Sequence, residues 1–188
     1  MNKDKFFTSI KASLFTKFTQ DQVDGINHIL DSCTKNNICD LRYVAYILAT
    51  AFHETAKTMR PIEEYGKGKG YDYGKKLKMS RQPYTVPDKI YFGRGYVQLT
   101  WYENYQSLGK ILGIDLLNKP ELALDKSVAS DIMIAGMTKG LFTGKSLKNY
   151  FNDTATDWVN ARKIINGLDK AELIAGYAKK FYTALTLD

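Results

Sequence analysis

The stretch from residue 41 to residue 54 constrains the fold more than any other part of the chain. Its apolar residues recur at offsets of three and four, which is the spacing of one buried face of an α-helix: Leu41, Val44, Ala45, Leu48, Ala51 and Phe52. Asp40 stands where a helix N-cap is expected. Pro61 is incompatible with smooth continuation of a helix, so we expect this helix to end soon after Glu54.

Two more segments of the first two thirds carry clear local signals. Thr19 and Gln22 form a capping-box pattern ahead of apolar residues at helical spacing, which predicts a helix over about residues 19–30. The segment "YVQLTW", at 96–101, is typical of a short extended stretch. A helix is expected after it, with these residues on one face: Tyr105, Leu108 and Leu112.

The last third is predicted to be helical throughout. We expect helical segments at 127–140, 154–167 and 170–185, of which the first two end at a glycine that suits a C-terminal cap. The core face of the last segment is expected to carry Leu173, Tyr177, Phe181 and Leu185. Because extended segments are scarce, the predicted fold class is mainly α, with at most a small β element.

Length and composition favour a globular enzyme or binding protein over a disordered or membrane-spanning chain. The 188 residues, 44% hydrophobic and 25% charged, predict a single domain over 1–188. The net charge of +7 favours polyanionic partners. No nucleic-acid module is recognisable. Cys33 and Cys39 lack the spacing of a zinc or redox motif, and both are expected to be reduced, although a disulfide across the loop between them stays open.

The N-terminal residues lack the long apolar core of a signal peptide. No run of eighteen or more apolar residues exists, so no stable membrane insertion is expected. We therefore expect a protein that is made in the cytoplasm. If it acts outside the membrane, another component, such as a holin, has to release it.

Residues 65–90 form a long segment without helical or strand periodicity, rich in Gly, Tyr, Lys and Pro. Loops of this length in compact domains are usually functional or disordered. Tyrosines among cations suit the wall of a groove that holds a sugar or a nucleic-acid strand.

Glu54 is the first candidate for acid–base chemistry. At the C-terminal end of a helix the macrodipole disfavours an ionised carboxylate, and an apolar neighbour such as Phe52 adds a desolvation penalty of the same sign. Both effects raise the pKa, as a general acid near neutral pH requires. The simpler alternative is a surface glutamate that pairs with Lys57, three residues further on.

Glu63 and Glu64 follow Glu54 across the bend that contains Pro61. Two carboxylates on opposite walls of a groove are the minimum for glycoside hydrolysis, in which one protonates the leaving oxygen and the other activates water. Two exposed glutamates that balance nearby lysines are the alternative. Arg94, in "GRG", lacks the context of a phosphate loop and is expected to pair with a carboxylate. His28 and His53 have no metal-ligand spacing, so no metal site or other cofactor is expected.

Several motifs together resemble the family 19 glycoside hydrolases, the chitinase-like enzymes that include many phage and bacterial cell-wall lysozymes. The resemblance runs from about residue 19 to the C-terminus. Its longest element is "YFGRGYVQLTWYENY" at 91–105, and three shorter ones accompany it: "HET" at 53–55, "IEEYG" at 62–66 and "ARKIING" at 161–167.

The resemblance implies a lysozyme-like, two-lobed helical fold with a substrate cleft, and hydrolysis of a β-1,4 bond next to N-acetylglucosamine with inversion. Glu54 matches the general acid. Glu64 best matches the general base, with Glu63 as its rival, and Thr100 matches the residue that holds the attacking water. The residues expected to bind substrate are His53, Tyr91, Gln98, Trp101, Asn104 and Asn166.

The chain also departs from the plant-type pattern. Ala56 and Lys57 replace a glycine pair, Glu103 replaces a tyrosine, and Leu173 and Ile174 stand where an arginine is usual. These departures favour the phage-type enzymes, so the leading hypothesis is a monomeric, bacteriolytic endolysin that cleaves peptidoglycan glycan strands. The charge of +7 agrees, because peptidoglycan is anionic and chitin is neutral. The alternatives are a chitinase that acts on chitin oligomers and a non-catalytic protein that binds cell-wall glycan.

Overall fold

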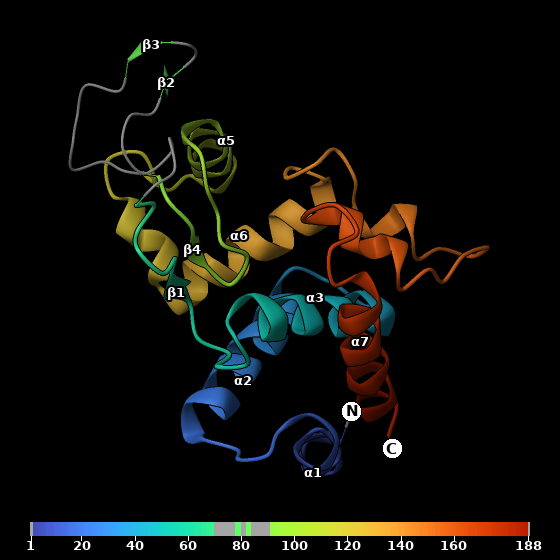
Figure 1. The fold of residues 1–188 in the computed structure, drawn as a ribbon. Helices are drawn as coiled ribbons and strands as arrows, with labels where there is room; N and C mark the ends of the chain where they lie inside the picture. Colours follow the sequence, from blue (N-terminus) through green and yellow to red (C-terminus); the bar gives the residue numbers. More distant parts are fainter. Residues whose placement is uncertain (1, 70–77, 80–81, 84–90, 188) are drawn as a thin grey trace.

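The computed structural model describes residues 2–69, 78–79, 82–83 and 91–187, and this part of the chain is mainly helical (Figure 1). Its α-helices are α1 (Lys3–Leu14), α2 (Gln20–Lys35), α3 (Leu41–Glu54), α5 (Tyr102–Leu112), α6 (Lys126–Lys139) and α7 (Ala171–Leu185). Its 3-10 helices are η1 (Pro120–Leu124), η2 (Leu147–Asn149) and η3 (Asn160–Ile164).

The strands are very short and form two antiparallel pairs. Strand β1 (Ile62–Glu63) pairs with β4 (Arg94–Gly95), in the register Ile62 to Gly95 and Glu63 to Arg94. Strand β2 (Lys78–Met79) pairs with β3 (Gln82–Pro83). In Figure 1, α5 lies toward one end of the molecule and α1 toward the other, with α3 and α6 between them.

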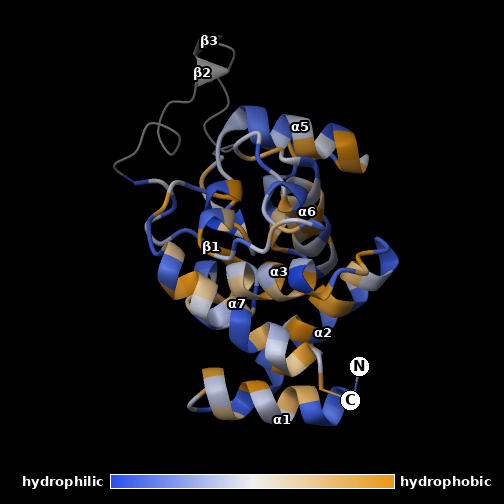
Figure 2. Cartoon of the chain, turned by 90° about the vertical axis from the view of Figure 1, so that its right-hand side faces the viewer, coloured by the Kyte–Doolittle hydropathy of each residue, from blue (hydrophilic) through white to orange (hydrophobic). Residues whose placement is uncertain are grey.

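Helix α3 is the central element, because its whole length from Val44 to Phe52 is buried. It packs mainly against α7, which in turn packs against α1, while α2 packs against α6. Figure 2 shows hydrophilic and hydrophobic residues interleaved along α1 and α7, as expected for helices with one face in the core. The C-terminal end of α3 is thereby held rigidly, and Glu54 is its last residue.

The expected start and end of α3 are confirmed, although the end has another cause. The Asp40 side chain accepts a hydrogen bond from the Arg42 amide at 2.8 Å and caps the N-terminus. At the other end, Ala56 and Lys57 adopt positive φ angles of 48° and 69°. This left-handed backbone turns the chain several residues before Pro61, so the proline is not what ends the helix. The capping box of Thr19 and Gln22 at α2 is also confirmed.

Three expectations about the C-terminal third and the N-terminus need correction. Leu173 lies on the solvent side of α7 and is 46% exposed, because the core face carries Ile174 and several alanines instead. The segment 154–167 forms only the short helix η3, and Asp157 binds the amide and side chain of Asn160 locally at its start. Helix α1 had no counterpart among the predicted elements.

The extended segment expected at 96–101 is replaced by a tight hairpin. Only Arg94 and Gly95 form a strand, and Leu99 folds back to bridge Arg94. Of the long segment expected at 65–90, residues 70–77, 80–81 and 84–90 lie outside the described residues, so its role as a groove wall stays a prediction.

Neither cysteine is bonded to the other. Cys33 is buried and Cys39 is exposed, and both are free thiols, which confirms the reduced state expected. Burial raises the pKa of the Cys33 thiol to about 12. Among the described residues, no helix combines the length and the apolar character needed to cross a membrane.

Candidate active site

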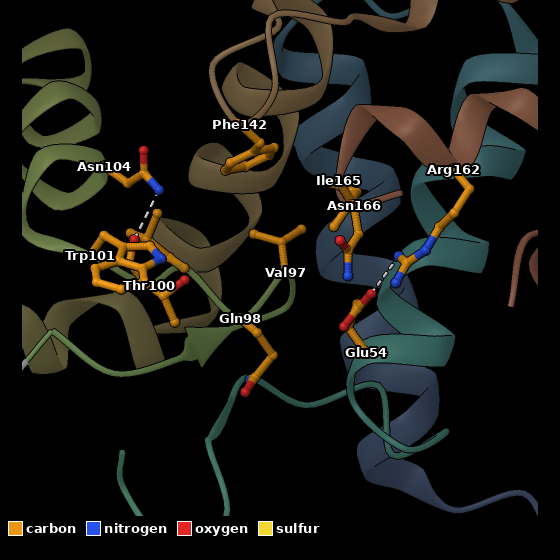
Figure 3. A pocket seen from close by; sticks show the side chains of 11 residues that line it. Glu54, Val97, Gln98, Thr100, Trp101, Asn104, Phe142, Arg162, Ile165 and Asn166 are labelled. Atoms are coloured by element: carbon orange, nitrogen blue, oxygen red, sulfur yellow. Dashed lines mark hydrogen bonds and ion pairs between the residues drawn. The ribbon is translucent and has the colours of Figure 1, made fainter. Parts of the chain in front are cut away.

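A pocket of about 380 Å³ opens between the end of α3, the hairpin before α5 and the segment after η3 (Figure 3). The six predicted site residues that it brings together are all polar or aromatic, and they come from three separate motifs: Glu54, Gln98, Thr100, Trp101, Asn104 and Asn166. The remaining lining residues were not predicted: Val97, Leu99, Phe142, Arg162 and Ile165.

Glu54 is held in the pocket by an arginine from η3. The Arg162 guanidinium donates from Nη1 to Glu54 Oε1 at 2.6 Å, and its Nε donates to the Asp169 carbonyl oxygen at 3.1 Å. Arg162 is only 4% exposed. The pairing of Glu54 with Lys57 is therefore wrong: the Lys57 ammonium lies over the rings of Phe52 and Tyr177 instead.

The Glu54–Arg162 contact ties the end of α3 to the segment after η3. Replacing Arg162 by methionine should destabilise the protein by about 3 kcal/mol, because it leaves a largely buried carboxylate without its partner. Urea unfolding of Arg162→Met against wild type measures the loss. Arg162→Lys keeps a cation but cannot serve both acceptors, so its loss should be smaller. Equal stability of Arg162→Met and wild type would contradict this account of the contact.

The hairpin from Arg94 to Trp101 presents the opposite side of the pocket in a strained conformation. Gln98 and Trp101 have positive φ angles of 52° and 73°, which residues other than glycine rarely adopt. The side-chain amide of Gln98 donates from Nε2 to the Ile62 carbonyl oxygen at 3.1 Å, and that of Asn104 donates from Nδ2 to the Thr100 carbonyl oxygen at 2.9 Å. Strained backbone of this kind clusters at ligand sites.

Glu63 and Glu64 have different partners, although they are adjacent in the chain. Glu63 forms ion pairs with Lys67 at 2.9 Å and with the buried Arg94 at 3.5 Å, which confirms the expected carboxylate partner of Arg94. Glu64 accepts a hydrogen bond from the Gly93 amide at 3.0 Å. The Glu63 carboxylate is therefore engaged on the face where Arg94 stacks on Phe92.

Gly93 connects Glu64 to the pocket. A Cβ at this position would lie 2.8 Å from Gln98 Oε1 and 3.3 Å from Glu64 Cβ, so the side chains of both residues rest on a position that only glycine leaves open. Gln98 lines the pocket, whereas Glu64 does not.

Thr100 lines the pocket next to Leu99. Arg94 and Leu99 exchange backbone hydrogen bonds of 3.1 and 2.8 Å, which places their side chains on one face together with Glu63. The assignment of the base to Glu64, with Glu63 as its rival, stays a prediction.

Four predicted site residues lie outside the pocket lining: His53, Glu63, Glu64 and Tyr91. Tyr91 is 1% exposed and its hydroxyl donates to the Leu117 carbonyl oxygen at 2.8 Å, so the expected contact with substrate is wrong. Burial lowers the pKa of the half-buried His53, and the neighbouring Glu54 opposes that effect. His53 does not line the pocket, and its role in binding stays a prediction.

Comparison with known proteins identifies the family. The profile of the family described as "Chitinase class I" matches residues 29–146 of the 188-residue chain. The chain belongs to the class I chitinase family. Among members of this family, the chain is 39% identical to endochitinase 1 of Theobroma cacao over 99 residues, which make up 47% of the chain and 30% of the cacao protein.

A second relative and a solved structure extend the comparison over more of the chain. An endochitinase of Arabidopsis thaliana is 33% identical over 129 residues, which make up 68% of this chain and 44% of the plant protein. The chain thus spans less than half the length of either plant relative. The crystal structure of a bacterial family 19 chitinase matches with a TM-score of 0.59 at 19% identity, covering 100% of this chain and 95% of that one. The expected mainly α, lysozyme-like fold with a small β element is confirmed.

Proposed function

We propose that the protein hydrolyses β-1,4 glycosidic bonds of N-acetylglucosamine polymers such as chitin. The observation that carries the proposal is the position of Glu54 in a polar pocket, where it contacts Arg162 and where amide side chains also line the wall. Amide groups such as those of Gln98, Asn104 and Asn166 suit the hydroxyl and acetamido groups of a sugar. Trp101, 45% exposed, offers an apolar face to a sugar ring.

In the proposed mechanism the two carboxyl groups act on opposite sides of the bond. Glu54 donates a proton to the leaving glycosidic oxygen. Glu64 takes a proton from a water molecule that Thr100 helps to hold, and the water attacks the anomeric carbon from the other side. Inverting enzymes of this kind place their carboxyl groups roughly 6.5–9.5 Å apart, so that a water molecule fits between. A helix end and a strand after a bend suit that separation.

We propose chitin as the first candidate substrate, because the relatives compared above are named as chitinases. This reverses the order of the sequence-based hypotheses, in which peptidoglycan came first and an endolysin of phage origin was expected. Peptidoglycan remains the second candidate on one observation: a net charge of +7 concentrates the protein on an anionic polymer, whereas neutral chitin gains nothing from it.

Product analysis separates the two substrates. The purified protein is incubated in parallel with chitin oligomers and with peptidoglycan, and the fragments are identified by mass spectrometry. Release of short N-acetylglucosamine oligomers, with the inverted anomer seen first by NMR, is the expected result. Release of muropeptides alone would favour the second candidate. Binding of either polymer without cleavage would contradict the proposed hydrolysis and favour a glycan-binding protein.

A further inference from the structure

The pocket has one apolar wall among its polar residues, and nothing in the proposed mechanism uses it. We define the apolar wall by its three side chains: Val97, Phe142 and Ile165. In Figure 3 they gather on the upper side of the pocket, above Gln98 and Glu54. Val97 is buried, whereas Phe142 and Ile165 are only partly buried, so two of the three keep apolar surface facing the pocket.

A glycine in α6 seats the ring of Phe142. A Cβ added at Gly136 would lie 2.0 Å from Phe142 Cζ, so the ring occupies the space that any side chain at position 136 would take. Helix α6 ends at Lys139, and the positive φ of 71° at the following Gly140 turns the chain back. The Leu141 amide then bonds to the Gly136 carbonyl oxygen at 3.0 Å, which brings the next residue, Phe142, over the helix.

A threonine fixes Phe142 relative to Ile165. The Thr143 hydroxyl lies 2.6 Å from the Lys163 carbonyl oxygen and 3.1 Å from that of Ile164, and donates to these acceptors. The turn after α6 is therefore attached to the end of η3. Phe142 and Ile165, the neighbours of these attachment points, both face the pocket as a result.

We propose that the apolar wall holds the methyl group of the N-acetyl substituent on the sugar bound beside Glu54, and that Phe142 determines which N-acyl groups fit. A hexosamine ring presents mainly hydroxyl groups, and the acetyl methyl is its one compact apolar group. Asn166, which follows Ile165 directly, supplies an amide that pairs with the polar part of the same substituent. This inference rests on the proposed substrate class, since it concerns how that substrate is recognised.

Binding is measured with Glu54→Gln as the reference protein, so that no ligand is consumed. The probes are one N-acetylglucosamine oligomer and its N-formyl counterpart, which differ only in the methyl groups. The reference should bind the N-acetyl oligomer about tenfold or more tightly, as one methyl in an apolar pocket allows. Adding Phe142→Ala should bring the ratio of the two dissociation constants close to one. Adding Phe142→Leu should restore most of it.

The matched control is Leu141→Ala, which shortens the neighbouring, partly buried residue outside the pocket. It should leave the ratio unchanged, and thermal unfolding verifies that each variant is folded. A ratio near one in the reference protein, an unchanged ratio in Phe142→Ala, or no binding of the N-acetyl oligomer would each overturn the inference. Cleavage is measured separately on the wild-type protein, which keeps Glu54. Tighter binding of the N-acetyl oligomer without cleavage by the wild type would contradict the proposed function alone. Cleavage without tighter binding of the N-acetyl oligomer would contradict this inference alone.

Discussion

Replacing Glu54 by glutamine should lower the rate of glycan hydrolysis by about 10²–10⁴-fold, the usual contribution of a general acid. Glutamine keeps the size and an acceptor oxygen for Arg162 but has no proton to give to the leaving oxygen. The rate is measured on chitin oligomers under saturating conditions. Binding should change little, because Gln98, Asn104 and Asn166 remain in place.

Glu103→Gln is the matched control for this variant. Glu103 lies exposed in the first turn of α5, near the pocket but not in its lining. Its replacement should leave the rate within about twofold of wild type, since exposed substitutions rarely matter. If Glu54→Gln hydrolyses the oligomers as fast as this control, Glu54 is not the acid and the proposed mechanism fails.

The second large effect distinguishes the two adjacent glutamates. Glu64→Gln should lower the rate by about 10²–10⁴-fold, because glutamine cannot take a proton from the attacking water. The fold should survive, since the amide oxygen of glutamine can still accept the hydrogen bond of the Gly93 amide. Rates at saturating oligomer, compared with wild type, give the result.

Glu63→Gln is expected to behave in the opposite way. It should keep most of the rate but lower the free energy of unfolding by about 1–3 kcal/mol, because the buried Arg94 loses the negative partner that it has at 3.5 Å. Urea unfolding of both variants completes the comparison. The reverse pattern, with a slow Glu63→Gln and an active Glu64→Gln, would transfer the role of base to Glu63.

Local signals predicted the parts of the fold that are governed by local physics. The Asp40 cap, the capping box at Thr19 and the glycine at the end of α6 are each decided within a few residues, and all three are confirmed. The prediction that Leu173 lies in the core was wrong, because helical spacing gives two possible buried faces in a segment rich in alanine. Only the packing of α7 against α3 decides between them.

The candidate site was predictable where a single motif carries it and unpredictable where distant segments meet. Glu54 and Thr100 come from strings that resemble a known family, and both line the pocket. Arg162 is 108 residues from Glu54 in the chain. No spacing rule links positions so far apart, and the motif "ARKIING" drew attention to Asn166 instead. Phe142 reaches the pocket only through the turn after α6, which no pattern in its own segment indicates.

The exposure of Trp101 makes the intrinsic tryptophan fluorescence of the protein sensitive to ligand binding in the pocket. The chain has two tryptophans. Trp158 packs between the rings of Phe151 and Tyr182, with centroids 4.9 and 5.5 Å away, and its emission follows the integrity of the core. Trp101 is 45% exposed in the lining of the pocket, so a glycan that covers it will shift its emission to shorter wavelength and shield it from iodide. One unlabelled sample can therefore report occupancy of the pocket and unfolding of the chain as separate fluorescence signals.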